Sequence, residues 1–219
     1  MNPVFITGGT GYLGRPLIEE LLAKGCEVHA LVRPGSETKL LAGARPVIGD
    51  ALDAETFVAR IPKGATIVHL VGTPHPSPAK AAEFRRVDLA SIRATTAAAA
   101  AARASHIVYV SVAHPAPMMK AYVAVRVEGE ALVEATGIPA TILRPWYVLG
   151  PGHRWPCALI PFYALFRALP ATREGARRLG LVTHRDMVAA LAGAVLSPPA
   201  GGLRIVDVPE IAKSLKPRT

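Results

Sequence analysis

Apolar residues along this chain gather in short runs that alternate with stretches of helical spacing. Runs rich in Val, Ile and Leu and bounded by turn residues predict buried strands of the kind found in parallel sheets. Apolar positions three and four residues apart predict the helices between them, most plainly over Pro16–Leu22. Six strands are predicted in the first two thirds of the chain and one near its end: 4–7, 27–32, 44–48, 65–72, 106–111, 139–143 and 203–208.

Strands that alternate with helices predict an α/β fold, a doubly wound parallel sheet with helices on both faces. A long helix is expected over 79–104, where six alanines in a row favour close packing against the sheet, and Asp53 is expected to cap a short helix that runs through Ala59. In such a fold ligands bind outside the carboxyl ends of the strands. Candidate chemistry is therefore sought at those ends.

The turn after the first strand is rich in glycine, with Gly8, Gly9, Gly11 and Gly14 among small and hydroxyl residues, and a helix follows it. Without Cβ atoms, the backbone N–H groups of such a turn can approach a diphosphate, which the positive end of the helix also attracts. A glycine turn in an ordinary α/β unit is the alternative. The strand before it and the helix after it favour a dinucleotide site, as in the Rossmann fold. The candidate cofactor-binding residues here are Gly8, Thr10, Gly11, Tyr12, Leu13 and Gly14.

The residues after the second strand indicate whether NAD or NADP binds. An acidic residue there would bond the ribose 2′-hydroxyl of NAD, but the chain has Arg33, with Lys39 a short loop away. Two cations suit a 2′-phosphate, so NADP is predicted in preference to NAD. The alternative is that Arg33 is only a loop arginine.

Further cofactor contacts are expected at the next two strand ends. Asp50 and Ala51 follow the third strand, where the adenine ring would lie, although Asp50 is equally compatible with a simple turn. Leu70, Val71 and Gly72 end the fourth strand and would flank the cofactor. His69 lies among apolar residues and is interpreted as a core histidine with satisfied hydrogen bonds.

The bulk properties narrow the class of protein. The 219 residues carry a net charge of +9, divided unevenly: 12 Lys and Arg against 9 Asp and Glu in residues 1–110, and 13 against 7 afterwards. This bias suits an anionic ligand, but no basic-aromatic pattern or recognition helix accompanies it, so nucleic acid is an unlikely partner. No apolar run approaches the about 20 residues of a membrane span, and no signal peptide precedes the first strand, so a cytoplasmic protein is expected. Cys26 and Cys157 stand in no metal-ligand spacing, and no metal site is predicted.

A second group of chemical residues follows the fifth strand. Ser111 ends that strand, and Tyr122 and Arg126 stand four apart in the next helix, so they share a face. Together with the glycine turn and Arg144-Pro145, these residues make the chain resemble the extended and atypical short-chain dehydrogenase/reductases. The nearest branches are the NAD-dependent epimerase/dehydratase and NmrA-like NAD(P)H-binding proteins.

The resemblance implies catalytic roles. In that family the serine orients a substrate carbonyl, the tyrosine exchanges the proton, and a lysine lowers the tyrosine pKa and holds the nicotinamide ribose. These roles fall on Ser111, Tyr122 and Arg126, and arginine in place of lysine is a departure, because it keeps its charge but does not readily give up a proton. An ordinary amphipathic pair is the alternative reading of Tyr122 and Arg126, since some family members bind cofactor without catalysis.

The aromatic loop after Arg144 completes the predicted site. By the resemblance its first residues touch the nicotinamide, so Pro145 and Val148 are cofactor candidates. Trp146, Tyr147 and Trp155 are candidates for lining a substrate pocket, although aromatic residues here also suit packing or an oligomer contact. The apolar segment 157–169 is read as a lid or dimer helix, and a homodimer is a partner the sequence allows.

Together these features predict one domain in which residues 1–150 form the cofactor-binding core and 151–219 form a small helical substrate-side segment plus the last strand. Its size argues against a nucleotide-sugar substrate. The predicted function is an NADP(H)-dependent oxidoreductase acting on a small carbonyl compound. The alternative is a non-catalytic NADP(H)-binding redox sensor of the NmrA-like kind.

Overall fold

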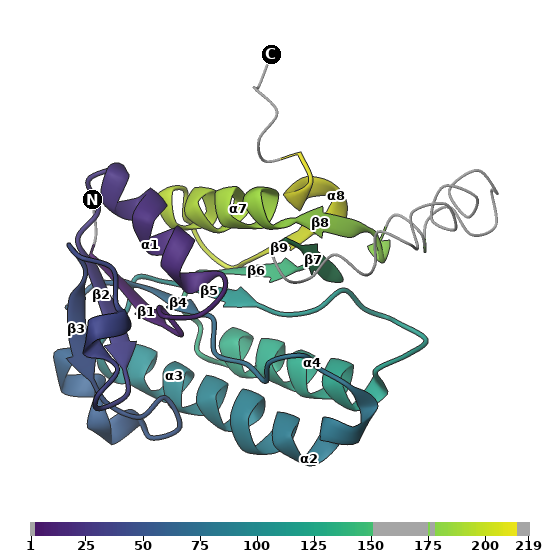
Figure 1. The fold of residues 1–219 in the computed structure, drawn as a ribbon, viewed down its shortest axis with the longest axis horizontal. Helices are drawn as coiled ribbons and strands as arrows, with labels where there is room; N and C mark the ends of the chain where they lie inside the picture. Colours follow the sequence, from purple (N-terminus) through teal and green to yellow (C-terminus); the bar gives the residue numbers. More distant parts are fainter. Residues whose placement is uncertain (1–2, 151–174, 176–177, 214–219) are drawn as a thin grey trace.

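Seven parallel strands form one sheet in the computed structural model, which describes residues 3–150, 175 and 178–213 (Figure 1). Their order is β3-β2-β1-β4-β5-β6-β9, so the chain starts in the middle, winds to one edge and then returns to build the other. This is the strand order of the Rossmann fold with β9 added, and the predicted doubly wound α/β fold is confirmed. The strands are β1 Val4–Thr7, β2 Val28–Val32, β3 Arg45–Ile48, β4 Thr66–His69, β5 His106–Val110, β6 Ala140–Arg144 and β9 Leu203–Asp207.

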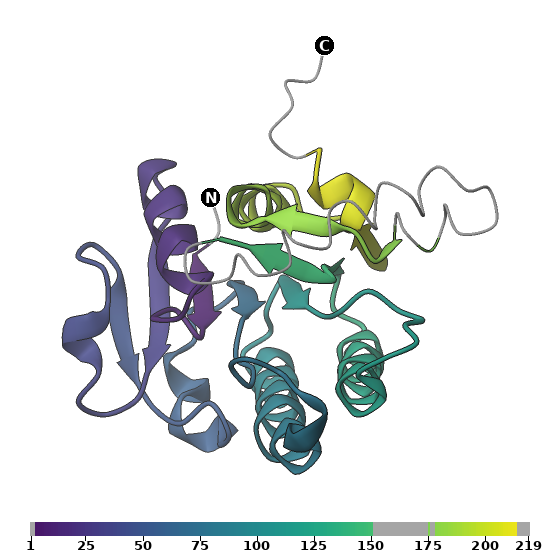
Figure 2. The ribbon, with the colours of Figure 1, turned by 45° about the vertical axis from the view of Figure 1, so that its right-hand side comes forward.

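Helices cover both faces of the sheet, as parallel strands require of their crossover connections (Figures 1 and 2). Helices α1 (Gly14–Ala23), α7 (His184–Leu196) and α8 (Val208–Ile211) lie on one face, and α3 (Ala90–Ala101) and α4 (Lys120–Ala135) on the other. Each face has its own apolar core. Leu17, Ile18 and Leu191 belong to the first, and Phe5, Ile92 and Ile142 to the second.

The helix expected over 79–104 is not one regular α-helix. It is built from the 3-10 turn η4 (Pro78–Lys80), the short helix α2 (Ala81–Glu83), the π-helical segment η5 (Phe84–Leu89) and α3. The alanines of α3 pack closely on the sheet as predicted, since Ala98 and Ala99 are buried. The π-helical turn was not predicted, and it carries a buried carboxylate, Asp88.

Two further local predictions need correction. Asp53 is a cap, since its carboxylate accepts from the N–H of Glu55 at 3.1 Å, but two 3-10 turns follow in place of an α-helix: η2 (Ala54–Thr56) and η3 (Val58–Arg60). The Thr56 hydroxyl donates to the Asp53 carbonyl at 2.7 Å and so takes the acceptor that a continuing helix would use.

Part of the predicted aromatic loop is a strand. β7 (Tyr147–Leu149) pairs in parallel with β8 (Leu181–Thr183), and the two form a small separate sheet beside the main one (Figure 1). The residues between them fall largely in 151–174, outside the described part of the chain, as do Trp155 and the apolar segment 157–169.

The predicted core histidine is confirmed. His69 is fully buried, and its Nδ1 lies 2.9 Å from the hydroxyls of both Thr7 and Thr95. Burial, with a smaller contribution from the charge of Arg126, lowers the pKa of His69 to about 3, so the ring stays neutral. Cys26 is a buried thiol, also as expected.

Helices long and apolar enough to cross a bilayer are absent from the described residues. The same part of the chain contains no group of three or more His, Cys, Asp or Glu side chains arranged to hold a metal ion.

Candidate functional site

The glycine turn forms a tight loop between β1 and α1. Gly8 has a φ of +79°, and its carbonyl accepts from the N–H of Gly11 at 3.0 Å. A Cβ at Gly8 would lie 2.9 Å from the backbone carbon of Leu70, and one at Gly14 would overlap the Gly8 carbonyl oxygen. Side chains are therefore excluded from two sides of this loop, which leaves its backbone bare.

No side chain of the described residues competes for the start of α1. None of them caps this helix, and its first turn contains no acidic residue. The first N–H groups of a helix have no partner within it and carry a partial positive charge. Thr10, Gly11 and Tyr12 are exposed at this point, so an anion can approach the N–H groups. The bare loop and the uncapped helix fit the diphosphate of a dinucleotide.

The fit of the glycine loop can be tested at Gly14. In Gly14→Ala the new methyl group would force the Gly8 carbonyl to move, and we expect NADPH binding to weaken by about 1–3 kcal/mol, the usual cost of overpacking. Isothermal titration of both proteins measures the change. Gly193→Ala in α7 is the matched control, because no atom of the described residues lies within 4 Å of the added methyl group, apart from the neighbouring backbone of its own helix. Equal affinities in the two variants would contradict the assignment of this loop.

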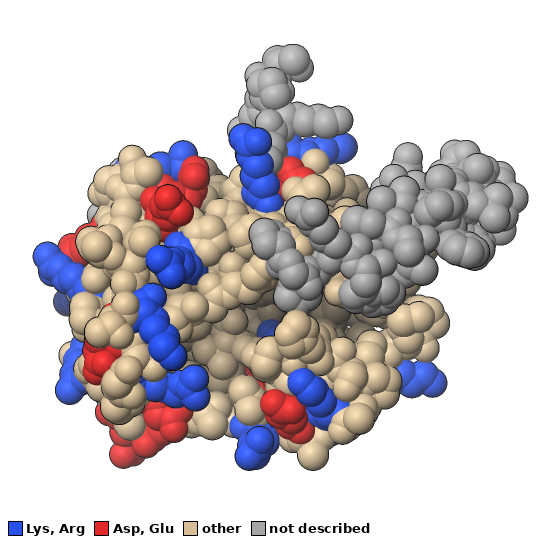
Figure 3. Space-filling view, viewed as in Figure 1, with Lys and Arg blue, Asp and Glu red and all other residues tan. Residues whose placement is uncertain are grey.

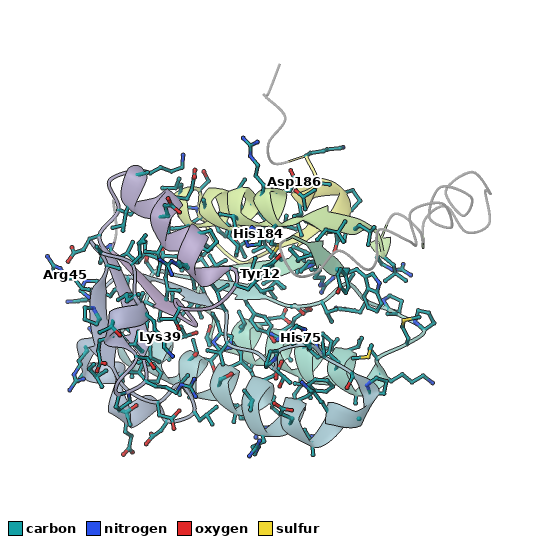
Figure 4. The ribbon with its side chains drawn as sticks, viewed as in Figure 1. Tyr12, Lys39, Arg45, His75, His184 and Asp186 are labelled. Atoms are coloured by element: carbon teal, nitrogen blue, oxygen red, sulfur yellow. The ribbon has the colours of Figure 1, made fainter. Side chains whose placement is uncertain are left out.

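A recess opens on the face of the molecule where the strands end, and Lys and Arg side chains gather on the side of it that β2 and β3 form (Figure 3). Arg33 follows β2 directly, and both Arg33 and Lys39 are exposed. Figure 4 shows Lys39 on that side and His75 on the opposite side. The two predicted cations are thus placed where they can meet an anionic ligand.

The two predicted adenine-binding residues lie in a turn after β3. One carboxylate oxygen of Asp50 accepts from the N–H of Leu52 at 3.0 Å, so Asp50 stabilises its own turn. Asp50 is exposed and Ala51 is half-buried. The turn role is established by this bond, and adenine binding stays a prediction.

The segment after β4 runs close to the buried, positively charged side chain of Arg126. Leu70 is tied to the glycine loop, since its N–H donates to the Thr7 carbonyl at 3.1 Å. Two residues later, a Cβ at Gly72 would overlap the Arg126 guanidinium. Glycine is required here by space, and this approach brings the predicted cofactor segment Leu70–Gly72 into contact with the predicted catalytic helix.

Arg126 is held by a buried network that the sequence did not reveal. Its guanidinium donates to Asp88 at 2.7 Å and to the Val110 carbonyl at 2.9 Å. The side chains of Arg126 and Asp88 are only 8% and 1% exposed. The other oxygen of Asp88 accepts from the N–H and hydroxyl of Thr73, at 2.9 and 2.6 Å. One ion pair therefore joins η5, α4, the end of β5 and the segment after β4.

Tyr122 lies against this network. The Arg126 guanidinium carbon is 5.1 Å from the centre of the Tyr122 ring, and the Phe84 ring packs against the same tyrosine at 5.0 Å. Burial acts to lower the pKa of Arg126, but Tyr122, Tyr109 and Asp88 outweigh it and raise the pKa above its ordinary value. The guanidinium is therefore a permanent positive charge beside a half-buried phenol.

Ser111 borders a second, partly buried ion pair. Arg144 holds Glu130 through two hydrogen bonds of 3.0 and 2.5 Å, and His114 Nε2 lies 3.3 Å from the same carboxylate. Burial raises the pKa of Glu130, but Arg144, Ser111 and His114 outweigh it, so the net shift is downward. The Ser111 hydroxyl lies close to Glu130, yet its oxygen has no partner of good hydrogen-bond geometry among the described residues. The Ser111 side chain is buried beside the Glu130 carboxylate, and its contact with a ligand stays a prediction.

Two ion pairs, one at each end of a single helical turn, hold α4 against neighbouring elements. Arg126 and Glu130 are four residues apart, and each meets a partner on a different element. Tyr122 stands one turn before Arg126 on the same face, so its position follows from theirs. The structure brings Tyr122 and Arg126 together and sets Arg126 against the carbonyl of Val110, the residue before Ser111.

Asp88, Glu130 and Arg144 were not among the predicted site residues. Arg144 entered the sequence analysis only through the family resemblance. A second signal was the pair of opposite charges at Arg126 and Glu130, on the helix face that also carries apolar Val133. Charged side chains on a buried face need partners, but the sequence does not say which.

The loop after β6 lies near the core on the side of α1 and α7. Pro145 is buried, and its carbonyl accepts from the N–H of Ala113 at 2.9 Å. Trp146 and Val148 are half-buried and pack against that core, and Tyr147 is half-buried in β7. These residues lie beside the carboxyl edge, as predicted. Their contacts with ligands stay predictions.

The sequence is similar to one family profile and to several known proteins. The sequence profile described as NAD(P)H-binding matches residues 8–153. A ceramide reductase of Caulobacter vibrioides is 32% identical over 209 residues, which span 94% of this chain and 64% of that protein. A 4-hydroxy-2-methyl-3-oxo-4-farnesyl-3,4-dihydroquinoline-1-oxide ketoreductase of Stigmatella aurantiaca is 30% identical over 168 residues, 67% of this chain and 50% of that protein. The chain thus spans less than two thirds of the length of these relatives.

Solved structures agree on the fold. A short-chain dehydrogenase/reductase superfamily protein from Agrobacterium tumefaciens with bound NAD superposes with a TM-score of 0.67 at 20% identity, covering 94% of this chain and 77% of that one. At this identity the likeness supports the fold alone.

Proposed function

The chain belongs to the NAD(P)H-binding family, and from this premise we propose that it is an NADP(H)-dependent oxidoreductase acting on the carbonyl group of a small organic compound. The observation that carries the proposal is the position of Tyr122 beside a buried, permanently charged Arg126, which in turn touches the Gly72 segment of the predicted cofactor site. When bound, the nicotinamide cofactor supplies the hydride or accepts it.

The residues of the chain supply the rest of the chemistry. In the reducing direction the carbonyl carbon gains a hydride and its oxygen gains a proton, which Tyr122 donates. The Arg126 charge stabilises the tyrosinate that remains, although arginine cannot pass a proton onward. Ser111, directly after β5, orients the carbonyl through its hydroxyl, the role that the family resemblance implies. The bare glycine loop and the start of α1 hold the diphosphate.

The relatives narrow the choice of substrates to try. The Caulobacter protein is named a ceramide reductase and the Stigmatella protein a ketoreductase for a farnesylated quinoline, and both names denote molecules with apolar chains. We therefore propose screening aldehydes, quinones and ketones with apolar chains, by following the absorbance of NADPH. Binding of NADPH without turnover on any of these compounds would count against the enzyme.

The preference for NADP over NAD rests on Arg33 and Lys39. In Arg33→Asp, a cation that can bond a 2′-phosphate becomes an anion that repels it, and we expect the ratio of NADPH to NADH affinity to fall by about 10- to 100-fold. Titrations with both cofactors measure the ratio.

Arg45→Asp is the control for Arg33→Asp. It makes the same change of charge at the amino end of β3, at the opposite edge of the sheet from the site, and Arg45 is exposed there. The ratio should stay unchanged in this variant. Equal affinities of the native protein for NADPH and NADH would contradict the role of Arg33.

A non-catalytic NADP(H) sensor is the second candidate, and one observation favours it. The Arg126 guanidinium is already bonded to Asp88 and Val110, and both groups of this ion pair are buried. In that arrangement Arg126 serves the structure of α4 whether or not Tyr122 exchanges a proton. The two candidates differ in whether the protein turns over a carbonyl substrate. We also propose that the protein is cytoplasmic and that it can form a homodimer.

A further inference from the structure

The start of α7 touches the glycine loop, far from it in sequence. The His184 ring packs edge-on against the Tyr12 ring with centres 4.4 Å apart, and its Nε2 lies 2.9 Å from the Tyr12 carbonyl oxygen. A carbonyl can only accept, so Nε2 carries the proton and donates it. Figure 4 shows the two side chains next to each other, between the loop before α1 and the start of α7.

Gly150 closes this contact from the other side. A Cβ at Gly150 would overlap the Tyr12 hydroxyl and would lie 2.8 Å from the Cβ of His184. Gly150 follows β7 directly, and His184 follows β8, so the small β7–β8 sheet presents both residues to Tyr12. The glycine is needed here because there is no room for a side chain.

The bond to Tyr12 has a consequence for the next N–H group. In a planar trans peptide, the carbonyl of one residue and the N–H of the next point in opposite directions. Holding the Tyr12 carbonyl toward His184 therefore turns the Leu13 N–H away from it, at the uncapped start of α1. Among the described residues, the Leu13 N–H donates to no backbone carbonyl.

We propose that His184 is a positioning residue for the cofactor diphosphate: its bond to the Tyr12 carbonyl aims the Leu13 N–H at the phosphates. This inference rests on the proposed NADP(H) site. The role is separate from that of Arg33, which concerns the 2′-phosphate at the other end of the adenosine. Loss of the His184 bond should weaken NADPH and NADH equally, whereas loss of Arg33 should change their ratio.

His184→Phe keeps a ring against Tyr12 and removes the donor. We expect the Kd of both NADPH and NADH to rise by about 3- to 10-fold, the effect of one hydrogen bond, with their ratio unchanged. Adenosine 2′-monophosphate lacks the diphosphate, so its Kd should not change. His184→Gln keeps an N–H donor and should stay within about 3-fold of the native Kd. Arg185→Gln is the control, because it changes the exposed residue next to His184. At physiological salt its Kd values for NADPH and NADH should match those of the native protein.

The outcomes separate this inference from the proposed function. If the native protein binds neither NADPH nor NADH, the proposed function fails. If it binds them and His184→Phe leaves both Kd values unchanged, the role of His184 is wrong and the proposed function stands. A parallel loss of affinity for adenosine 2′-monophosphate in His184→Phe would also overturn the inference, because it would indicate general damage to the fold.

Discussion

Tyr122→Phe is expected to lower kcat by about 100- to 10,000-fold on any carbonyl substrate that the native protein reduces. The variant removes the proton donor and leaves the ring, so the packing of Phe84 and Arg126 against it should persist. The Kd for NADPH should therefore change little. Steady-state rates and cofactor titrations on the same preparations test both statements.

Tyr109→Phe is the matched control. It removes another phenol hydroxyl close to Arg126, whose guanidinium carbon lies 5.9 Å from the Tyr109 ring centre, but this tyrosine is buried in the core. Burial raises the pKa of Tyr109 to about 12 despite the nearby charge of Arg126, so it is not suited to proton exchange. We expect kcat to stay within about threefold in this variant. Turnover that survives Tyr122→Phe would exclude the proposed mechanism.

The sensor gives a different pattern. Under that hypothesis NADPH binds, no compound of the panel is turned over above a background rate, and Tyr122→Phe does not alter that background. A protein that behaves in this way would keep the glycine loop and Arg33 as its functional residues. Cofactor titrations alone do not separate the two hypotheses, because both require binding.

The sequence predicted those parts of the fold and site whose signals are local. The glycine loop is such a part, since a strand, the glycines and the helix after them lie within Val4–Ala23. The strand ends are another, because parallel strands align their carboxyl ends, as the register of Thr7 with His69 shows. Residues such as Arg33 and Ser111 could be placed at one edge from the strand pattern alone.

Contacts between distant residues could not be predicted in this way. Asp88 and Arg126 are 38 residues apart, and no periodic pattern marks a buried ion pair. The π-helical turn that carries Asp88 has no composition that distinguishes it from the α-helix around it. The contact of His184 with Tyr12 spans 172 residues and depends on the pairing of two three-residue strands.

Arg126 differs from the lysine that the family resemblance led us to expect, and the structure suggests a physical reason. A lysine has one ammonium group, whereas the planar guanidinium reaches both the Asp88 carboxylate and the Val110 carbonyl. Asp88 supplies the matching charge and also fixes the backbone of Thr73. The arginine therefore serves as a structural tie between α4 and two strand ends in addition to any effect on Tyr122.

Arg126→Met is accordingly expected to destabilise the protein by about 3–5 kcal/mol, because it leaves the Asp88 carboxylate buried without a counter-charge. Urea denaturation followed by circular dichroism measures the free energy of unfolding. Arg93→Met is the matched control: the Arg93–Glu128 pair has the same 2.7 Å separation, but its side chains are 59% and 39% exposed. Exposed pairs contribute about 0–1 kcal/mol, so the control should unfold almost as the native protein does.

The double variant Asp88→Asn with Arg126→Met decides between a lost charge pair and simple loss of packing. An asparagine at position 88 carries no charge and does not need the guanidinium as a partner. The loss of unfolding free energy in the double variant should therefore be smaller than the sum of the losses in the two single variants, by about 1–3 kcal/mol. Additive losses would mean that Arg126 acts through its volume alone. In that case its charge would not be coupled to Asp88, and the argument that this ion pair holds Arg126 beside Tyr122 would fail with it.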